Sequence, residues 1–184
     1  MTEHLSLIAQ AGFQRDPKAK TIGYFAKDGH VLVDRRLCAE LKAEALATGQ
    51  NARLSLHAGP DELLHQMVIV QHRSHYNRPK LHMGKAKSWH LIEGRMAIVV
   101  FDEAGKVVER TVLDEREAFL YRLPADLYHT NVPLTPHVIH QEILLGPFVG
   151  DSDRRYGVFS PDGSDQAAAA DYILGLVREL LSND

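Results

Sequence analysis

The middle of the chain constrains the fold most, because short apolar runs there alternate with turn sequences. Met96 to Phe101 is an apolar run, Asp102 to Gly105 is typical of a turn, and Val107 to Leu113 follows. Glu117 to Leu123 then alternates into Pro124. Strands of this length joined by turns pair as antiparallel hairpins. The sequence therefore predicts an antiparallel sheet in this part of the chain.

Composition narrows the class of protein. The chain has 184 residues and a net charge of -3, and its Lys and Arg residues are dispersed, which argues against a nucleic-acid partner. Its single cysteine, Cys38, excludes an intramolecular disulfide and a thiolate-rich metal site, and its apolar neighbours favour a small core residue. The sequence has no run of 18 apolar residues and no secretory signal, so we expect a cytoplasmic, soluble protein with no membrane partner.

Two groups of polar residues flank the predicted sheet. The first consists of Lys80, His82 and Lys87, followed by Gly94, and the second runs from Pro124 to His129. Side chains two residues apart in a strand point to the same face, so Lys80 and His82 should both point into the interior of the sheet structure.

These segments resemble the two metal-binding motifs of the cupin family. The first cupin motif reads His-x-His, four residues, Glu, six residues, Gly, and in this chain Lys80 and Lys87 replace the first His and the Glu. The second motif reads Pro-x-Gly-x-x-His, which corresponds to Pro124 to His129, with Asp126 at the turn glycine. Aspartate also tolerates the left-handed conformation of a turn. The resemblance implies a mostly β fold, a small antiparallel β-barrel of jelly-roll type.

Further segments resemble the WbuC-type cupin-fold metalloproteins, which are encoded among genes for bacterial surface polysaccharide. The resemblance covers roughly residues 31 to 162, and its order and spacing are more specific than any single motif. The matching segments are 34–47, 51–57, 61–67, 76–79, 94–95, 101–107, 128–130, 142–148 and 160–161. The resemblance implies a metal-binding protein that acts on a sugar or sugar-nucleotide intermediate of polysaccharide biosynthesis.

The resemblance also implies a ligand set for the metal. His82 and His129 are the matched ligands, and His140 or Glu142 would complete the shell. Imidazole and carboxylate ligands suit iron, manganese, nickel or zinc. The alternative is a barrel without metal, in which His82 and His129 bond to each other or to water. The resemblance assigns no reaction, because isomerisation, epimerisation and oxygenation all occur on this fold.

The lysines point to a second function from a different class. Two ammonium groups beside a divalent cation would cost several kcal/mol in a poorly solvated cavity. Lys80 and Lys87, with Arg78 at the mouth, would instead make an electropositive pocket for a phosphate or carboxylate. Trp89 and Tyr128 could stack on a sugar ring or belong to the core. This alternative is a metal-independent, non-catalytic cupin that binds a small anionic ligand.

The chain is expected to form one structural domain. Residues 1–50 are predicted to be a helical and strand segment packed on the barrel, 51–162 the barrel, and 163–184 a C-terminal helix. A helix over 34–47 would begin at Asp34 and stop at Gly49. Residues 24–25 and 30–33 are predicted to pair as a hairpin.

The C-terminal segment 164–181 carries an apolar stripe at helical spacing. Such a stripe must be buried. It either covers its own barrel or packs against a second subunit in a homodimer. His57 and His65 precede the first motif, and we expect them near the rim of the pocket.

Overall fold

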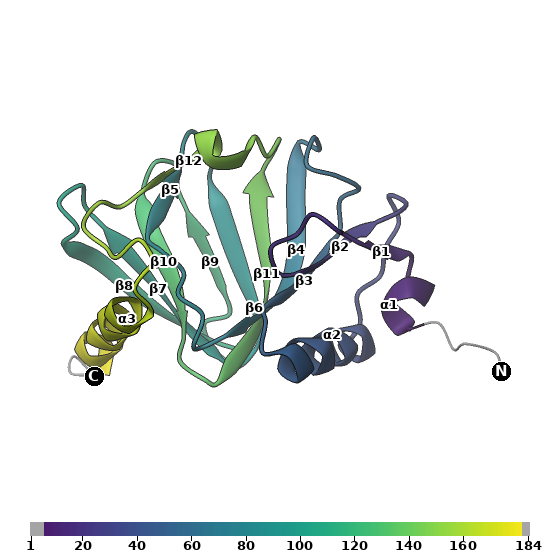
Figure 1. Ribbon diagram of the computed structural model, residues 1–184, viewed down its shortest axis with the longest axis horizontal. Coiled ribbons are helices and arrows are strands. Elements are labelled where there is room, and N and C mark those ends of the chain that lie inside the picture. The colour runs from purple at the N-terminus through teal and green to yellow at the C-terminus, as the bar shows by residue number, and fades with distance from the viewer. Residues whose placement is uncertain (1–5, 182–184) are drawn as a thin grey trace.

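The computed structural model describes residues 6–181, and eight of its strands fold as a jelly roll (Figure 1). These strands are β4 (Leu64–His72), β5 (Lys80–His82), β6 (Lys87–Glu93), β7 (Arg95–Phe101), β8 (Val107–Asp114), β9 (Leu120–Leu123), β10 (Tyr128–Pro133) and β11 (His137–Leu145). One sheet contains the order β4-β11-β6-β9 and the other the order β5-β10-β7-β8. This exchange of strands between two antiparallel sheets is the jelly-roll topology, which cupins share. The predicted fold class is therefore confirmed.

Short strands extend both sheets. β1 (Phe13–Arg15), β2 (Ile22–Ala26) and β3 (Ala52–Ser55) continue the first sheet beyond β4, and β12 (Arg154–Tyr156) continues the second beyond β5. The predicted pairing of residues 24–25 with 30–33 is wrong, because β2 pairs with β1 on one side and with β3 on the other. Phe13 in β1 is 2% exposed, whereas Leu32 is 80% exposed.

The helix α2 (Arg35–Thr48) begins and ends where the sequence predicts. The Asp34 side chain accepts a hydrogen bond from the Leu37 backbone N–H at 2.8 Å, and Gly49 has the left-handed conformation with φ 67°. The helix buries Leu37, Cys38 and neighbouring apolar residues against the outer face of the first sheet. Cys38 is therefore a core residue. Two short helical segments, α1 (Leu7–Gln10) and η1 (Gly150–Asp153), complete the connections.

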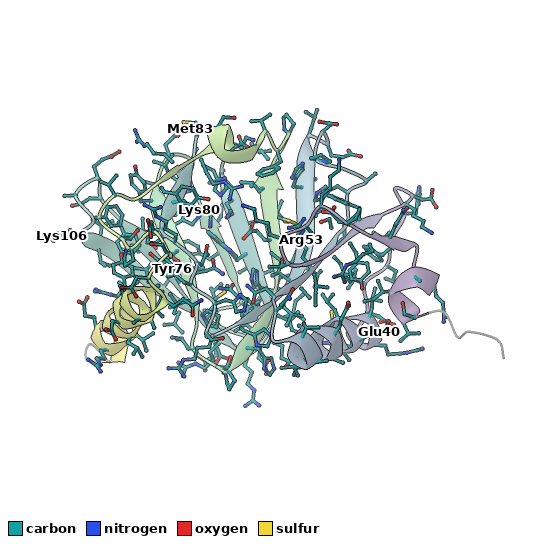
Figure 2. All side chains as sticks on the ribbon, viewed as in Figure 1. Glu40, Arg53, Tyr76, Lys80, Met83 and Lys106 are labelled. Carbon is teal, nitrogen blue, oxygen red and sulfur yellow. The ribbon has the colours of Figure 1, made fainter. Side chains whose placement is uncertain are left out.

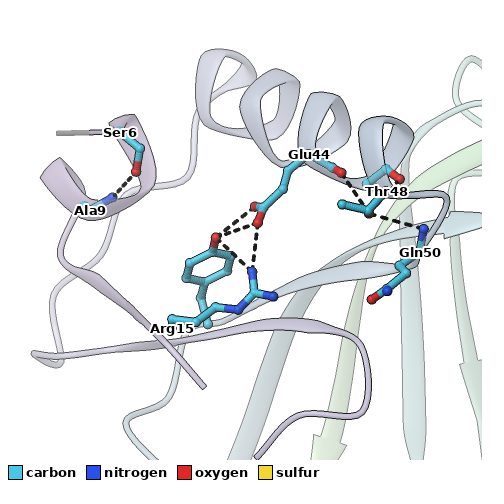
Figure 3. Close-up of polar contacts among 8 residues, drawn as sticks. Ser6, Ala9, Arg15, Glu44, Thr48 and Gln50 are labelled. Atoms are coloured by element: carbon cyan, nitrogen blue, oxygen red, sulfur yellow. Dashed lines mark hydrogen bonds and ion pairs between the residues drawn. The ribbon is translucent and has the colours of Figure 1, made fainter. Parts of the chain in front are cut away.

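A carboxylate on α2 ties the first hairpin to the helix (Figure 3). Glu44 accepts hydrogen bonds from the Tyr24 hydroxyl at 2.8 and 2.9 Å and from the Arg15 guanidinium at 2.8 Å. Arg15 and Tyr24 are also direct partners in the pairing of β1 with β2. The contact holds the N-terminal strands and α2 together on one side of the jelly roll.

The C-terminal helix α3 (Gln166–Leu181) packs on the outside of the second sheet (Figure 1). Leu176 joins a buried cluster with Leu81, Val99 and Phe101. The ring of Tyr172 meets the ring of Tyr76 edge to face. The apolar stripe therefore covers its own barrel. The homodimer stays a prediction, and the stripe no longer supports it.

The space between the two sheets has an apolar part and a polar part. The apolar part is a buried cluster of Trp89, Leu91, Met96, Ile98, Val100, Leu113, Leu123 and Val138. The polar part lies beside Trp89 and is the pocket described below. Within residues 6–181, no helix has the length and apolar character needed to cross a membrane.

Candidate functional site

A pocket of about 470 Å³ opens between the sheets. Its lining comes from the inward faces of β3, β4, β6 and β11, and from β5 and β10 opposite them. Figure 2 shows Lys80 and Arg53 in the middle of the molecule. The polar and charged side chains of the lining include Arg53, Ser55, His57, His65, Gln71, Asn77, Lys80, His82, Lys87, Asn131, His140, Glu142 and Arg154. The period-two prediction that Lys80 and His82 point inward is therefore correct, and Lys87 lines the same pocket.

Lys87 and Glu142 form a buried ion pair in this pocket. In the pairing of β6 with β11, Lys87 lies opposite Leu144 and Glu142 opposite Trp89, so the two charged residues are diagonal neighbours. The Lys87 Nζ lies 3.3 Å from the Glu142 Oε1 and 5.2 Å from the centre of the Trp89 ring. Burial alone would raise the pKa of Glu142, but the cations around it, Lys87 first, lower that pKa to about 2. The carboxylate is therefore ionised and neutralised by Lys87.

Lys80 heads a chain of side-chain amides. Its Nζ donates to the Asn77 Oδ1 at 2.5 Å, and the Asn77 amide donates to the Asn131 Oδ1. The Asn131 amide in turn donates to the Gln71 Oε1 at 2.6 Å. Burial and the nearby Lys87 charge lower the pKa of Lys80 to about 7. Lys80 thus differs from Lys87, since its hydrogen-bond partner is a neutral amide.

Three buried histidines surround the charged groups. The ring centres of His82 and His129 are 6.0 Å apart. The His129 Nδ1 lies 2.9 Å from the Leu127 carbonyl oxygen and donates to it, so its Nε2 carries a lone pair. Burial, reinforced by the Lys87 charge, lowers the pKa of His82 to about 2 and that of His129 to about 3. Burial likewise lowers the pKa of His140 to about 4. All three imidazoles are therefore neutral near pH 7.

The buried histidines make stability depend on pH. Below the ordinary histidine pKa of about 6.5 the unfolded chain binds a proton at His82 that the folded protein does not bind until the pH approaches 2. The free energy of unfolding therefore decreases as the pH falls from about 6, and His82 contributes about 1.4 kcal/mol per pH unit to this decrease. We expect His82→Asn to remove that contribution. Urea unfolding at several pH values between about 6 and 4 measures the slope.

The exposed His90 supplies the matched control for this prediction. His90→Asn should leave the slope of the wild type unchanged. An unchanged slope in folded His82→Asn would mean that His82 is solvated and titrates normally.

The donor set does not fit a divalent metal. In the part of the chain that the structure describes, no three His, Cys, Asp or Glu side chains form a group that could hold a metal ion. The only carboxylate of the predicted set, Glu142, is paired with Lys87, and Lys80 adds a second amine to the same pocket. The predicted ligands His82, His129, His140 and Glu142 surround one polar interior, but a cation would meet the ammonium group of Lys87 there. Divalent metals need deprotonated or neutral ligands without adjacent cations.

Three predicted ligand contacts, Arg78, Trp89 and Tyr128, are not among the residues that line the pocket. Tyr128 is adjacent to His129 in β10 and points to the opposite face, where it packs edge to face on Phe159. The Arg78 guanidinium donates to the Gly157 carbonyl at 3.3 Å and stacks over the Tyr156 ring. Trp89 is fully buried and packs edge to face against His129. Trp89 therefore belongs to the buried core beside Lys87, whereas Tyr128 and Arg78 hold neighbouring elements together.

The rim contains a stacked histidine pair. The rings of His57 and His65 are 4.1 Å apart and nearly parallel, and both residues line the pocket. This agrees with their predicted place near the rim. Gln71, Asn77 and Asn131, which form the amide chain, are site residues that the sequence did not predict. Asn131 follows His129 by two residues, so the alternation of β10 was a signal for its inward direction.

Comparison with known proteins found one matching domain model and a set of similar structures. The model of a domain of unknown function (DUF6016) matches residues 33–113. No curated protein matches the sequence.

The similar structures include oxalate decarboxylase from Bacillus subtilis, at 15% identity and a TM-score of 0.46 over 58% of this chain and 27% of that chain. CapF with an inhibitor is 11% identical, with a TM-score of 0.46 over 58% of this chain and 31% of that one. A structure of DMSP lyases is 18% identical, with a TM-score of 0.43 over 58% of this chain and 52% of that one. In each case the chain matches only part of the other protein's length.

Proposed function

We propose that this protein uses its jelly-roll pocket to bind a small anionic ligand without a metal, through Lys80 and Lys87. The observation that carries the proposal is that Lys80 and Lys87 line one pocket, in which Lys87 is buried and Glu142 is the carboxylate that pairs with it. The lining contains the cations Lys80, Lys87, Arg53 and Arg154, against the one anion Glu142. Arg53 is paired with Asp16 at 3.3 Å, and the pocket still carries an excess of positive charge.

The neutral part of the lining indicates the rest of the ligand. Gln71, Asn77 and Asn131 contribute amide groups to the lining, and His82 and His140 contribute neutral imidazoles. Both nitrogens of His82 and of His140 are buried without a described partner. Amides and neutral imidazoles donate and accept hydrogen bonds, as sugar hydroxyls do. We therefore propose a phosphate or carboxylate that carries hydroxyl groups, such as a sugar phosphate or a sugar acid.

A second candidate function is the one that the resemblance to WbuC-type proteins implies. It is a metal-dependent protein that acts on a sugar or sugar-nucleotide intermediate of bacterial surface polysaccharide biosynthesis. The observation in its favour is the number of buried ring nitrogens without a described partner, on His82, His129 and His140. The ion pair of Lys87 with Glu142 argues against it. Elemental analysis of protein purified without chelators separates the two functions, because near-stoichiometric iron, manganese, nickel or zinc would favour the second.

Ligand-induced stabilisation tests the anion site. Inorganic phosphate, glucose 6-phosphate and gluconate should each be tried, and a bound anion at a hundred times its dissociation constant should stabilise the protein by about 2.7 kcal/mol. Lys87→Glu places a carboxylate in the pocket and should abolish the effect. Lys80→Ala should weaken it.

Lys106→Glu is the matched control, since it makes the same charge change at an exposed position. The anions should stabilise the Lys106→Glu variant as much as they stabilise the wild type. Equal stabilisation of the wild type, Lys87→Glu and Lys80→Ala by the same anions would show that they bind elsewhere, and the proposal would fail.

A further inference from the structure

We propose that the amino group of Lys80 forms an imine with an aldehyde or ketone carbonyl of the bound ligand. The inference rests on the proposed function and adds to it the chemical class of the ligand, a small anion that carries a carbonyl group. Lys80 is then a nucleophile, and Lys87 remains the contact for the anionic group.

The pairing of the lysines distinguishes Lys80 from its neighbours. Lys87 faces the Glu142 carboxylate at 3.3 Å, and Lys85 faces the Asp153 carboxylate at 2.6 Å. Lys80 instead donates one hydrogen bond, to the amide oxygen of Asn77. A carboxylate partner favours the ammonium form of a lysine, whereas an amide oxygen carries no full charge to do so. Lys80 is thus the amine of the pocket best placed to give up a proton.

The surroundings of Lys80 also favour the uncharged form of its amine. The amine lines the pocket and is therefore open to a ligand, but it lies in a poorly solvated interior. Burial is the largest cause that lowers the pKa of Lys80. Lys87 and Arg154 add positive charge nearby, which also disfavours a further cation, whereas the Glu142 charge acts in the opposite direction.

A desolvated lysine next to another cation is the arrangement that activates an amine for imine formation. The lone pair of the neutral Lys80 Nζ attacks the carbonyl carbon, and the π electrons of the carbonyl move to its oxygen. Protons move from the nitrogen to that oxygen, which leaves as water when the C=N bond forms. The products are one imine and one water for each amine and carbonyl consumed, and the step requires no oxidant or reductant. Lys87 would bind the anionic group of the same molecule.

Trapping with glyoxylate tests the proposal, because glyoxylate carries an aldehyde next to a carboxylate. The intact protein is treated at pH 7 with glyoxylate and sodium cyanoborohydride, which reduces an imine to a stable secondary amine. Peptide mass spectrometry then follows each lysine with time. We expect Lys80 to be modified at least about ten times faster than the exposed Lys27 and Lys106, because it lines the anion pocket beside Lys87 and its hydrogen-bond partner is a neutral amide.

Two variants and a competitor make the result specific. Lys80→Arg keeps a cation but removes the nucleophile, and should abolish the fast modification. Lys87→Arg keeps both the cation and Lys80, and should still be modified at Lys80. Glycolate has a hydroxyl group in place of the aldehyde, so it can occupy the anion site without forming an imine. Added glycolate should slow the modification of Lys80 in the wild type, and this readout needs no variant to fold.

The outcomes separate the two proposals. If glycolate stabilises the protein and Lys80 reacts no faster than Lys27 and Lys106, the imine is overturned and the anion site stands. If glyoxylate modifies Lys80 selectively and Lys80→Arg abolishes this, both stand. If glycolate and phosphate neither stabilise the wild type nor slow the modification of any lysine, the anion site itself is overturned.

Discussion

Replacing Lys87 by methionine is expected to destabilise the protein by about 3–5 kcal/mol, because it leaves the Glu142 carboxylate buried without its partner. The ammonium of Lys87 is 3.3 Å from that carboxylate, and the two side chains are only 5% and 14% exposed. Methionine keeps the volume of the side chain and its packing on Trp89 while removing the charge. Urea unfolding at pH 7 measures the loss.

Two controls separate charge from packing. Lys87→Met combined with Glu142→Leu removes both charges, and this double variant should recover most of the lost stability, since two apolar groups can replace a buried ion pair with little cost. Arg155→Met breaks an exposed pair with Glu103, in which the side chains are 58% and 76% exposed. It should change stability by less than about 1 kcal/mol. A loss as small as this in Lys87→Met would mean that water enters the pocket and screens Glu142.

Local patterns in the sequence predicted the elements that depend on local interactions. Asp34 and Gly49 mark the ends of α2 because a cap needs only a side-chain oxygen and a residue that accepts positive φ. The alternation around Lys80 and His82 predicted their direction because side chains in a strand alternate faces. The predicted pairing of a strand over residues 30–33 with β2 was wrong for a non-local reason. β2 takes Phe13–Arg15 and Ala52–Ser55 as neighbours, and a pattern of single residues does not encode that choice.

Some members of the candidate site were predictable from the sequence, but their pairing was not. The family resemblance predicted Lys87 and Glu142 separately, Lys87 as the replacement of a ligand and Glu142 as a ligand. Their ion pair depends on the register of β6 against β11, two strands separated by most of the barrel. The amide chain from Lys80 to Gln71 likewise joins β5, a loop, β10 and β4. Such contacts follow from sheet order, which the motifs imply only through the resemblance.

The ion pair also changes the meaning of the metal motif. In the sequence alone, Glu142 is an available carboxylate and the lysines are two substitutions at ligand positions. In the structure, Glu142 pairs with Lys87, so its carboxylate is not available to a metal cation. The buried neutral histidines beside them are then hydrogen-bonding groups for a polar ligand. This is the physical basis for preferring an anion over a metal in the pocket.

Restoring the replaced motif residues should create a metal site. In the double variant Lys80→His and Lys87→Glu, the new imidazole and carboxylate would join His82 and His129, and Glu142 would lose its cationic partner. Lys80, His82 and Lys87 line the same pocket in the wild type, so the new ligands would face one another. Removing two cations and adding one anion favours a divalent ion by several kcal/mol, or about a thousandfold in affinity. Isothermal titration with manganese, iron and nickel measures the gain.

A charge-matched comparison shows whether the new ligands or the lost cations cause that gain. Lys80→Gln with Lys87→Gln removes the same two cations and supplies amides, which are poor ligands for these metals. This variant should gain far less affinity than the double variant with histidine and glutamate. Adding His129→Ala to the latter should weaken binding again, because it removes one ligand of the set. If the folded double variant binds no better than the wild type, the side chains at 80 and 87 do not occupy the ligand positions of the cupin motif. The alignment of residues 80–94 with that motif would then have to be abandoned, although the jelly-roll topology would stand on its own strand order.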